Sequence, residues 1–367
     1  MSNKQAELRS GKLTLTWEKR QLSSPWLSAA IPIFSVFMAL FLSGAFLALT
    51  GFNPLEIYGA MLDGAFGSAY GISETLVKAI PLALAGLGVA LAFRMLLWNI
   101  GAEGQFYMGA FAASWVALTF PDLPTQIMLP AMFLAGALAG GVWALIPAIP
   151  RAVLGVNETI TTLMLNYVAI LWVDYLVYGP WRDPAGFNFP LTAPFSAAAH
   201  LPTYGATRVH FGLVFALIGA VIIYIVLQRT KWGYEIRVIG ENQTAARYAG
   251  MSISKNIMLV MFLSGGFAGL AGMSEVSGIT HRLQHGISSG YGYTAIIVAW
   301  LSKLNPFTII AVAFLLGGLL VGGYNTQTMG VPSATVSMIQ GAILFFLLGG
   351  ELLTRYRIYF TRKGENS

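Results

Sequence analysis

The sequence predicts an all-α protein that crosses a membrane many times. Hydrophobic residues make up 56% of its 367 residues and charged residues only 10%, and the mean hydropathy is +0.68. Apolar runs of about 20 residues, the length that a helix needs to cross a bilayer, recur along almost the whole chain. A backbone in lipid must satisfy its hydrogen bonds internally, which a helix does within one segment. We therefore expect a polytopic transmembrane helical bundle rather than a soluble domain with one anchor.

The apolar runs divide this bundle into about ten spans. We expect them near 27–50, 72–94, 101–120, 126–148, 158–178, 210–228, 256–278, 288–302, 305–324 and 331–350. The run at 288–302 follows a Gly-Ser-rich segment and is too short for a full crossing, so it predicts a broken or re-entrant helix. The expected domains are a cytoplasmic N-terminal tail, 1–26, a transmembrane domain, 27–350, and a cytoplasmic C-terminal tail, 351–367.

The basic residues indicate the orientation of the bundle. The formal net charge is +6. Lys and Arg gather in the connections that the ten spans place on one side of the membrane, above all between 229 and 255. The positive-inside rule predicts that both termini are cytoplasmic, and cytoplasmic loops beside lipid, rather than a nucleic-acid site, explain the positive charge. We expect the chain to lie in a bacterial inner membrane. Cysteine is absent, which excludes disulfides and thiolate chemistry. His281 and His285 lack a third ligand nearby, so we expect no metal site and no catalytic centre.

Small residues in the spans predict close helix packing. Three G-x-x-x-G pairs, Gly136/Gly140, Gly265/Gly269 and Gly318/Gly322, have the spacing that lets two helices approach closely in lipid. Near the start of the second span, Glu74 and Lys78 are four residues apart and are expected to neutralise one another.

The segment 229–255, "RTKWGYEIRVIGENQTAARYAGMSISK", is the longest polar stretch expected on the cytoplasmic side. Helix connections usually need about 2–8 residues. Its middle predicts a short Ala-rich helix with a turn at Gly240 before it and Gly250 as its C-terminal cap. An ordered helix in so long a loop indicates docking of a partner, although an amphipathic helix on the inner leaflet has the same composition.

Three segments resemble one known family. "GENQTAARYAG" (240–250) is similar to the inside-loop motif of permease subunits in ATP-binding-cassette (ABC) importers for branched-chain amino acids, ribose-type sugars and nucleosides. "NIGAEGQFYMGA" (99–110) resembles a second motif of that group, and 155–184 resembles its nucleoside and simple-sugar branch. The resemblance covers most of 72–350. It implies a coupling helix that sits in a groove of the ATPase subunit, carried by Gly240, Asn242, Ala245, Ala246, Tyr248 and Gly250.

The sequence contains no G-x-x-x-x-G-K-[ST] phosphate loop, so energy must come from a partner or an ion gradient. The resemblance implies a non-enzymatic transport subunit that binds no cofactor itself, with ATP and Mg²⁺ on partner ATPases. Its other partners would be a second permease copy or paralogue and an extracytoplasmic binding protein. The solute would be small and polar, a nucleoside, purine or simple sugar. The alternative is an ion-coupled secondary transporter that uses the intramembrane carboxylate of Glu103.

Polar side chains within spans are costly and usually mark a pathway or a partner. The candidate pathway residues are Asn99, Glu103, Gln105, Asn166, Tyr167, Tyr291, Tyr293 and Asn325. Two other interpretations stay open from the sequence. Glu103 has the position of a cap at the start of the third span, and the tyrosines are typical of an interfacial aromatic belt.

Overall fold

Helices form most of the chain in the computed structural model, which describes residues 13–19 and 25–362. The chain divides into two compact units. The larger unit is Asn53–Val336, and the smaller unit joins Met1–Phe52 to Ser337–Ser367.

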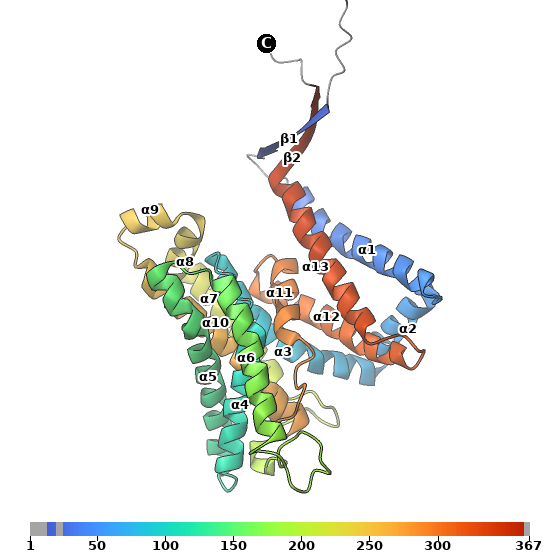
Figure 1. Cartoon of the computed structure of the whole chain (residues 1–367), viewed down its shortest axis with the longest axis vertical. Helices are drawn as coiled ribbons and strands as arrows, with labels where there is room; N and C mark the ends of the chain where they lie inside the picture. Colours follow the sequence, from blue (N-terminus) through green and yellow to red (C-terminus); the bar gives the residue numbers. More distant parts are fainter. Residues whose placement is uncertain (1–12, 20–24, 363–367) are drawn as a thin grey trace, which may run out of the picture. The chain divides into compact units, whose positions relative to one another are not determined.

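The larger unit is a helical bundle, which confirms the predicted all-α fold. Its elements are α2 (Pro54–Phe66), α3 (Ala69–Arg94), α4 (Ala102–Thr119), α5 (Thr125–Leu154), α6 (Glu158–Tyr178), η1 (Ala197–Ala199), α7 (Gly212–Arg229), α8 (Lys231–Glu241), α9 (Gln243–Tyr248), α10 (Ile253–Glu275), the π-helical turn η2 (Val276–Thr280), α11 (Tyr291–Leu301) and α12 (Pro306–Gln327). Figure 1 shows α8 and α9 at one end of this bundle, with the loop between α6 and α7 at the opposite end.

Helices α3 and α10 form the centre of the larger unit. The most apolar part of α3 is 89% buried and that of α10 with η2 is 72% buried, against 33% for α6 and for α7. The reason lies in the sequence, because α3 is apolar around nearly its whole circumference and such a helix is stable only inside a bundle. The peripheral helices instead expose large apolar side chains such as Leu171 and Ile222, as lipid contact requires.

Close backbone contacts between α4, α5 and α10 confirm the packing role of the glycine pairs. A Cβ atom on Gly140 would lie 2.3 Å from the Gly265 carbonyl oxygen, and one on Gly269 would lie 2.2 Å from the Gly136 carbonyl oxygen. The third pair packs elsewhere, because Gly318 and Gly322 of α12 face Phe66 and Met61 of α2. At Gly140, Gly269 and Gly322 the helices touch through their backbones, and at Gly318 the Phe66 ring fills the space that a side chain would need.

The ten expected spans each coincide with a helix, but fewer helices can cross a membrane alone. Six described helices are long and apolar enough, and a seventh if Ile33–Leu49 and Pro54–Phe66 form one broken span. Helix α4 has a polar first turn, and α11 has 11 residues, about 16 Å of helix at 1.5 Å per residue. The short α11 agrees with the broken helix that the sequence predicts at 288–302.

Helix α2 lies between the first two expected spans, where no helix was predicted. Asn53 caps it by accepting a hydrogen bond from the Leu55 amide, and Pro54 occupies its first turn, which are typical start signals. Ile57, Met61 and Ala65 are buried at spacings of four residues. The helix was therefore readable from the sequence, since its caps and its apolar face are both present.

The smaller unit contains α1 (Pro25–Leu49), most of α13 (Ala334–Arg355) and two strands. The Ser35 hydroxyl of α1 donates to the Phe346 carbonyl of α13 over 3.0 Å. Strands β1 (Leu13–Lys19) and β2 (Tyr356–Arg362) pair in antiparallel register, with Leu13 opposite Arg362. This two-stranded ladder joins segments that the sequence analysis described as two separate tails.

Candidate coupling surface and pathway residues

Helix α8 packs its backbone directly against the end of α3. The Thr230 hydroxyl caps α8 by accepting a hydrogen bond from the Gly233 amide over 3.0 Å. Gly240 lies inside α8, so the predicted turn at this residue is wrong. A Cβ atom here would lie 2.3 Å from the Arg94 carbonyl oxygen, which shows that Gly240 serves close packing instead of chain reversal.

Helix α9 is a short helix with a cap at each end. Asn242 Oδ1 accepts from the Ala245 amide over 3.0 Å, and Gly250 ends the turn in the left-handed region with φ of +76°, as predicted. Ala246 is fully buried, whereas Tyr248 is 90% exposed. Helix α9 is thus held by its caps and by Ala246, and it presents Tyr248 outward at the end of the bundle.

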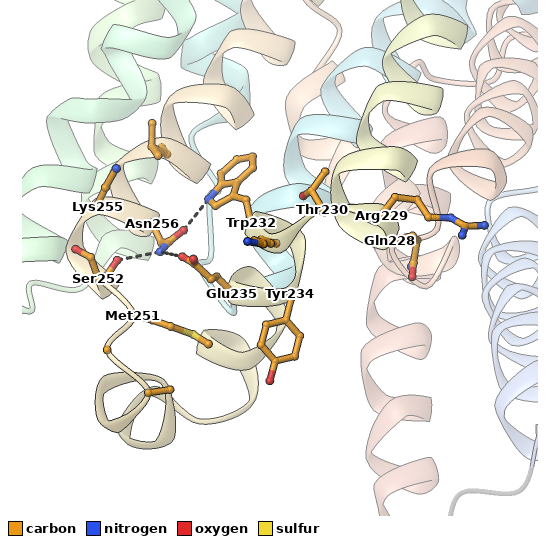
Figure 2. A pocket seen from close by; sticks show the side chains of 14 residues that line it. Gln228, Arg229, Thr230, Trp232, Tyr234, Glu235, Met251, Ser252, Lys255 and Asn256 are labelled. Carbon is orange, nitrogen blue, oxygen red and sulfur yellow. Dashed lines mark hydrogen bonds between the residues drawn. The ribbon is translucent and has the colours of Figure 1, made fainter.

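A cleft of about 840 Å³ separates α8 from the end of α9 and the start of α10 (Figure 2). Asn256 orders its wall, because its Oδ1 accepts from the Trp232 indole over 2.6 Å and its Nδ2 donates to Glu235 over 2.9 Å. The cleft is also lined by Arg229, Lys231 and Lys255. The Asn256 network fixes α8 to α10 and so sets where α9 projects.

The loop between α3 and α4 holds a closed amide network. Asn99 and Gln105 exchange two hydrogen bonds, of 3.0 Å and 2.9 Å. Asn99 also donates to the Ser264 hydroxyl of α10 over 2.9 Å and accepts from the Gly101 amide over 3.1 Å. Both side chains are at most 1% exposed. In the described structure these two amides connect α4 to α10.

Glu103 and Asn166 cap the starts of two helices. Glu103 Oε2 accepts from the Gly292 amide over 2.7 Å, at the start of α11, and its carboxylate also receives hydrogen bonds from Ser288 and from the Tyr293 amide. Asn166 of α6 accepts from the Gly104 amide over 2.8 Å and donates to the Ile100 carbonyl over 2.9 Å. The first amides of a helix have no partner within the helix, so by accepting from them Glu103 holds the start of the short α11 in place.

The comparisons with known proteins decide the family. Residues 71–348 match the permease component of the branched-chain amino acid transport system. The chain belongs to this permease family. It is 39% identical to the glucose ABC transporter permease protein TsgB13 of Haloferax volcanii, over 96% of each chain. It is 36% identical to the guanosine ABC transporter permease protein NupP of Bacillus subtilis, over 92% of this chain and 97% of that one.

A third relative is the nucleoside ABC transporter permease protein NupB of Lactococcus lactis, which is 31% identical over 86% of this chain and 90% of its own. These similarities confirm the predicted resemblance to the nucleoside and simple-sugar branch, and they identify a transport subunit rather than an enzyme. They also favour an ABC permease over the ion-coupled alternative. The carboxylate on which that alternative depends, Glu103, is engaged in capping α11.

The remaining candidate pathway residues of the permease differ in side-chain exposure and in hydrogen-bond partners. Tyr291 is 1% exposed and Tyr293 is 36% exposed, and Asn166 donates to the Tyr293 hydroxyl over 3.3 Å. Tyr167 is 56% exposed on α6. Asn325 of α12 donates to the Ala60 carbonyl of α2 over 3.2 Å. The structure therefore joins Asn166 to Tyr293 but not to Tyr167 or Asn325, and a pathway role for these residues stays a prediction.

A buried charged cluster was missed by the sequence analysis. Lys78 of α3 donates to the Tyr291 hydroxyl over 2.8 Å, and its ammonium lies 3.9 Å from the buried carboxylate of Glu275. The predicted Glu74–Lys78 pair is wrong, because Glu74 pairs with Arg208 over 2.9 Å. The partners of both residues come from distant segments, so spacing along one helix gave no signal for them.

Three histidines meet where the loop between α6 and α7 crosses η2. The rings of His200 and His281 stack with centroids 3.8 Å apart, and His210 is fully buried and accepts from the Gly212 amide through Nδ1 over 3.2 Å. Burial is the largest cause that lowers the pKa of His210, to about 4, and His281 and Arg208 lower it further. Burial also lowers the pKa of His281. These two rings are therefore neutral in the folded permease at neutral pH.

We expect the purified permease to lose stability as the pH falls from about 6.5 to about 4. The unfolded chain binds a proton at His210 in this range and the folded chain does not, so protons favour unfolding. The whole shift, to a pKa of about 4, corresponds to about 3 kcal/mol, of which about 2 kcal/mol is lost between pH 6.5 and pH 5. Thermal unfolding in detergent at pH 7.5 and pH 5 measures the effect. The His210→Asn variant, which keeps an acceptor for Gly212, should show a smaller difference between the two pH values; an equal difference would contradict the assignment.

Proposed function

We propose that this chain is the membrane subunit of an ABC importer, that it forms the pathway for a small polar solute, and that a separate ATPase drives it through α9. The observation that carries this proposal is the geometry of α9. It is capped at both ends and rests on buried Ala246, and it presents a 90% exposed Tyr248 at one end of the bundle. A large exposed aromatic residue on a rigid support is a typical anchor for a protein partner.

The proposed solute is a nucleoside or a simple sugar. The relatives named for glucose and for guanosine are 39% and 36% identical to this chain, so similarity supports both classes. Nucleosides and sugars share hydroxyl groups, which amide and phenol side chains bind in protein pathways. Tyr293, which is 36% exposed, offers such a group, and its hydroxyl is held by a hydrogen bond from the buried Asn166 amide over 3.3 Å.

The proposed assembly contains two ATPase subunits, a second permease subunit and an extracytoplasmic binding protein. ATP and Mg²⁺ would bind to the ATPases, since this sequence has no phosphate loop. The α8–α9 end carries Arg229, Lys231, Arg237, Arg247 and Lys255. This excess of basic residues supports a cytoplasmic location for that end and an inner-membrane orientation with cytoplasmic termini.

Transport by the reconstituted complex tests this function. The permease would be placed in liposomes with its ATPase, paired permease and binding protein, and uptake of radiolabelled guanosine, ribose and glucose would be measured with and without ATP. We expect uptake of one of these solutes to require ATP and to be unaffected by a proton uncoupler. Uptake that ignores ATP and collapses with the uncoupler would overturn the proposal in favour of ion coupling.

A further inference from the structure

Three segments meet at the C-terminal end of α3, at the α8–α9 end of the bundle. They are the end of α3 with the turn after it, 93–98, residue Gly240 of α8, and the end of α11 with the turn after it, 300–304. We call this meeting point the Arg94 junction. Here α8, which leads into α9, contacts the end of α3. The end of α3 in turn contacts the turn before α12.

The backbones of α8 and α3 are in direct contact at Gly240. The Cβ position of Gly240 lies 2.3 Å from the Arg94 carbonyl oxygen and 3.2 Å from Met95 Cα, so the two backbones touch. The adjoining residue Ile239 is 1% exposed. Close-packed backbones transmit displacement because they cannot interpenetrate or compress. A shift of α8 toward the bundle must therefore push the end of α3 as well.

The Arg94 side chain extends this contact to the turn between α11 and α12. Its Nη2 donates to the Leu304 carbonyl oxygen over 3.3 Å. Its Nε is buried and has no hydrogen-bond partner among the described residues. The guanidinium has five N–H donors in a fixed plane. Because Arg94 Nη2 is bonded to one carbonyl and Nε has no partner, the side chain can form a hydrogen bond to another acceptor when the turn moves.

The backbone at this junction is strained in three places. Leu96, Lys303 and Leu304 have φ of +56°, +51° and +59°, in the left-handed region that costs non-glycine residues about 1 kcal/mol or more each. Such residues gather at switch regions, where the surrounding structure holds a conformation that the chain alone would not adopt. Here they form the two turns that Arg94 connects.

Aromatic packing joins the same two turns. The ring centroids of Phe93, Trp98 and Trp300 lie 5.2 Å to 5.7 Å from one another. Trp300 belongs to the last turn of α11, whose first turn is held by Glu103 and Lys78. Because α11 is only 11 residues long and regular, a displacement at Trp300 is carried along the helix to Tyr291 and Tyr293.

We propose that Arg94 is a positioning residue for transport, which passes movement of α8 and α9 to α11. This inference rests on the proposed function, since the movement would be supplied by the ATPase at α9. The guanidinium does not touch the solute. It keeps the turn that contains Leu304 attached to the end of α3, so that a shift of α8 tilts α11 and displaces Tyr293 in its first turn.

The test separates ATP hydrolysis from uptake in the full reconstituted complex. Arg94→Met removes the donors but keeps the length of the side chain, and Arg94→Lys keeps a charge and a donor. Arg94→Lys is therefore the matched comparison at the same position. We expect Arg94→Met to lower the solute moved per ATP hydrolysed at least fivefold with hydrolysis within twofold of wild type. Arg94→Lys should recover part of this ratio.

A purely structural role of Arg94 predicts a different result. Assembly, hydrolysis and uptake would then fall together and the solute moved per ATP would stay constant, which would overturn the inference. An Arg94→Met complex that couples like wild type would overturn the inference alone and leave the proposed function standing. A wild-type complex without ATP-dependent uptake would overturn both.

Spin labels provide a direct readout, because the permease contains no cysteine and single cysteines can be introduced without background. Val153, Glu241 and Lys303 are exposed at the α8–α9 end. In the wild-type complex ATP should change both the 153–241 and the 153–303 distance. In Arg94→Met the first change should persist and the second should disappear. Persistence of both changes in the variant would contradict transmission through Arg94.

Discussion

Replacing Tyr248 by glutamate is expected to abolish ATP-driven uptake while the permease stays folded. The side chain of Tyr248 is 90% exposed, and among the described residues it makes no hydrogen bond or ring contact. Removing this side chain should therefore leave the helical bundle folded. At a protein interface, loss of a central tyrosine typically costs about 2 kcal/mol or more, and a carboxylate adds an unpaired charge. Binding of the ATPase should weaken about 30-fold or more, measured by co-purification and by uptake.

Tyr70→Glu is the matched control for this prediction. Tyr70 is 70% exposed and stands at the first turn of α3, at the opposite end of that helix from the Arg94 junction. Its replacement should leave ATPase binding unchanged. If Tyr248→Glu and Tyr70→Glu bind the ATPase equally well, α9 is not the docking helix.

Ala246 differs from Tyr248 although both belong to the same motif. Ala246 is fully buried, so it supports α9 from below and has no surface to offer a partner. A charged residue there would detach α9 from the bundle, because burying an unpaired charge is very costly. The sequence motif alone does not separate these two roles, since it gives the order of residues but not which face of α9 points inward.

The sequence predicted the bundle well because its signals are local. Apolar runs locate most of the helices. The spacing of Gly265 and Gly269 predicts a close backbone approach, and the structure shows it against Gly140 and Gly136. Helix caps are equally local, as Asn242 and Gly250 show for α9. These features depend on residues within one or two turns of each other, which a single sequence displays directly.

The polar network was not predictable in the same way. Glu103 bonds to Gly292, which is 189 residues away, and Lys78 bonds to Tyr291 across 213 residues. Burial makes such bonds favourable because an unpaired polar group in the interior costs about 1–3 kcal/mol. The sequence shows that each group needs a partner, but the choice of partner follows from how α3, α4, α10 and α11 pack. Spacing within one helix therefore suggested the wrong partner for Lys78.

The packing of α10 leads to the second large effect. Gly269→Ala should destabilise the permease by about 3 kcal/mol, at the upper end for overpacking. The added Cβ would lie 2.2 Å from the Gly136 carbonyl oxygen. Both atoms are bonded directly to helix backbones, so no side-chain rotation can make space. Helices α5 and α10 must then separate, which opens the contacts along both. The measurement is the midpoint of thermal unfolding in detergent, together with the yield of monodisperse protein.

Gly266→Ala, one turn away on the same helix, provides the matched comparison. A Cβ atom there would meet only the Ala137 carbonyl oxygen, at 3.3 Å, and a shift of a few tenths of an ångström relieves that contact. Alanine also favours the helix over glycine by about 1 kcal/mol, which offsets the crowding. The Gly266→Ala midpoint should therefore stay near wild type while that of Gly269→Ala falls. Equal midpoints would mean that α5 and α10 are free to separate, and that their glycines do not hold the centre of the bundle together.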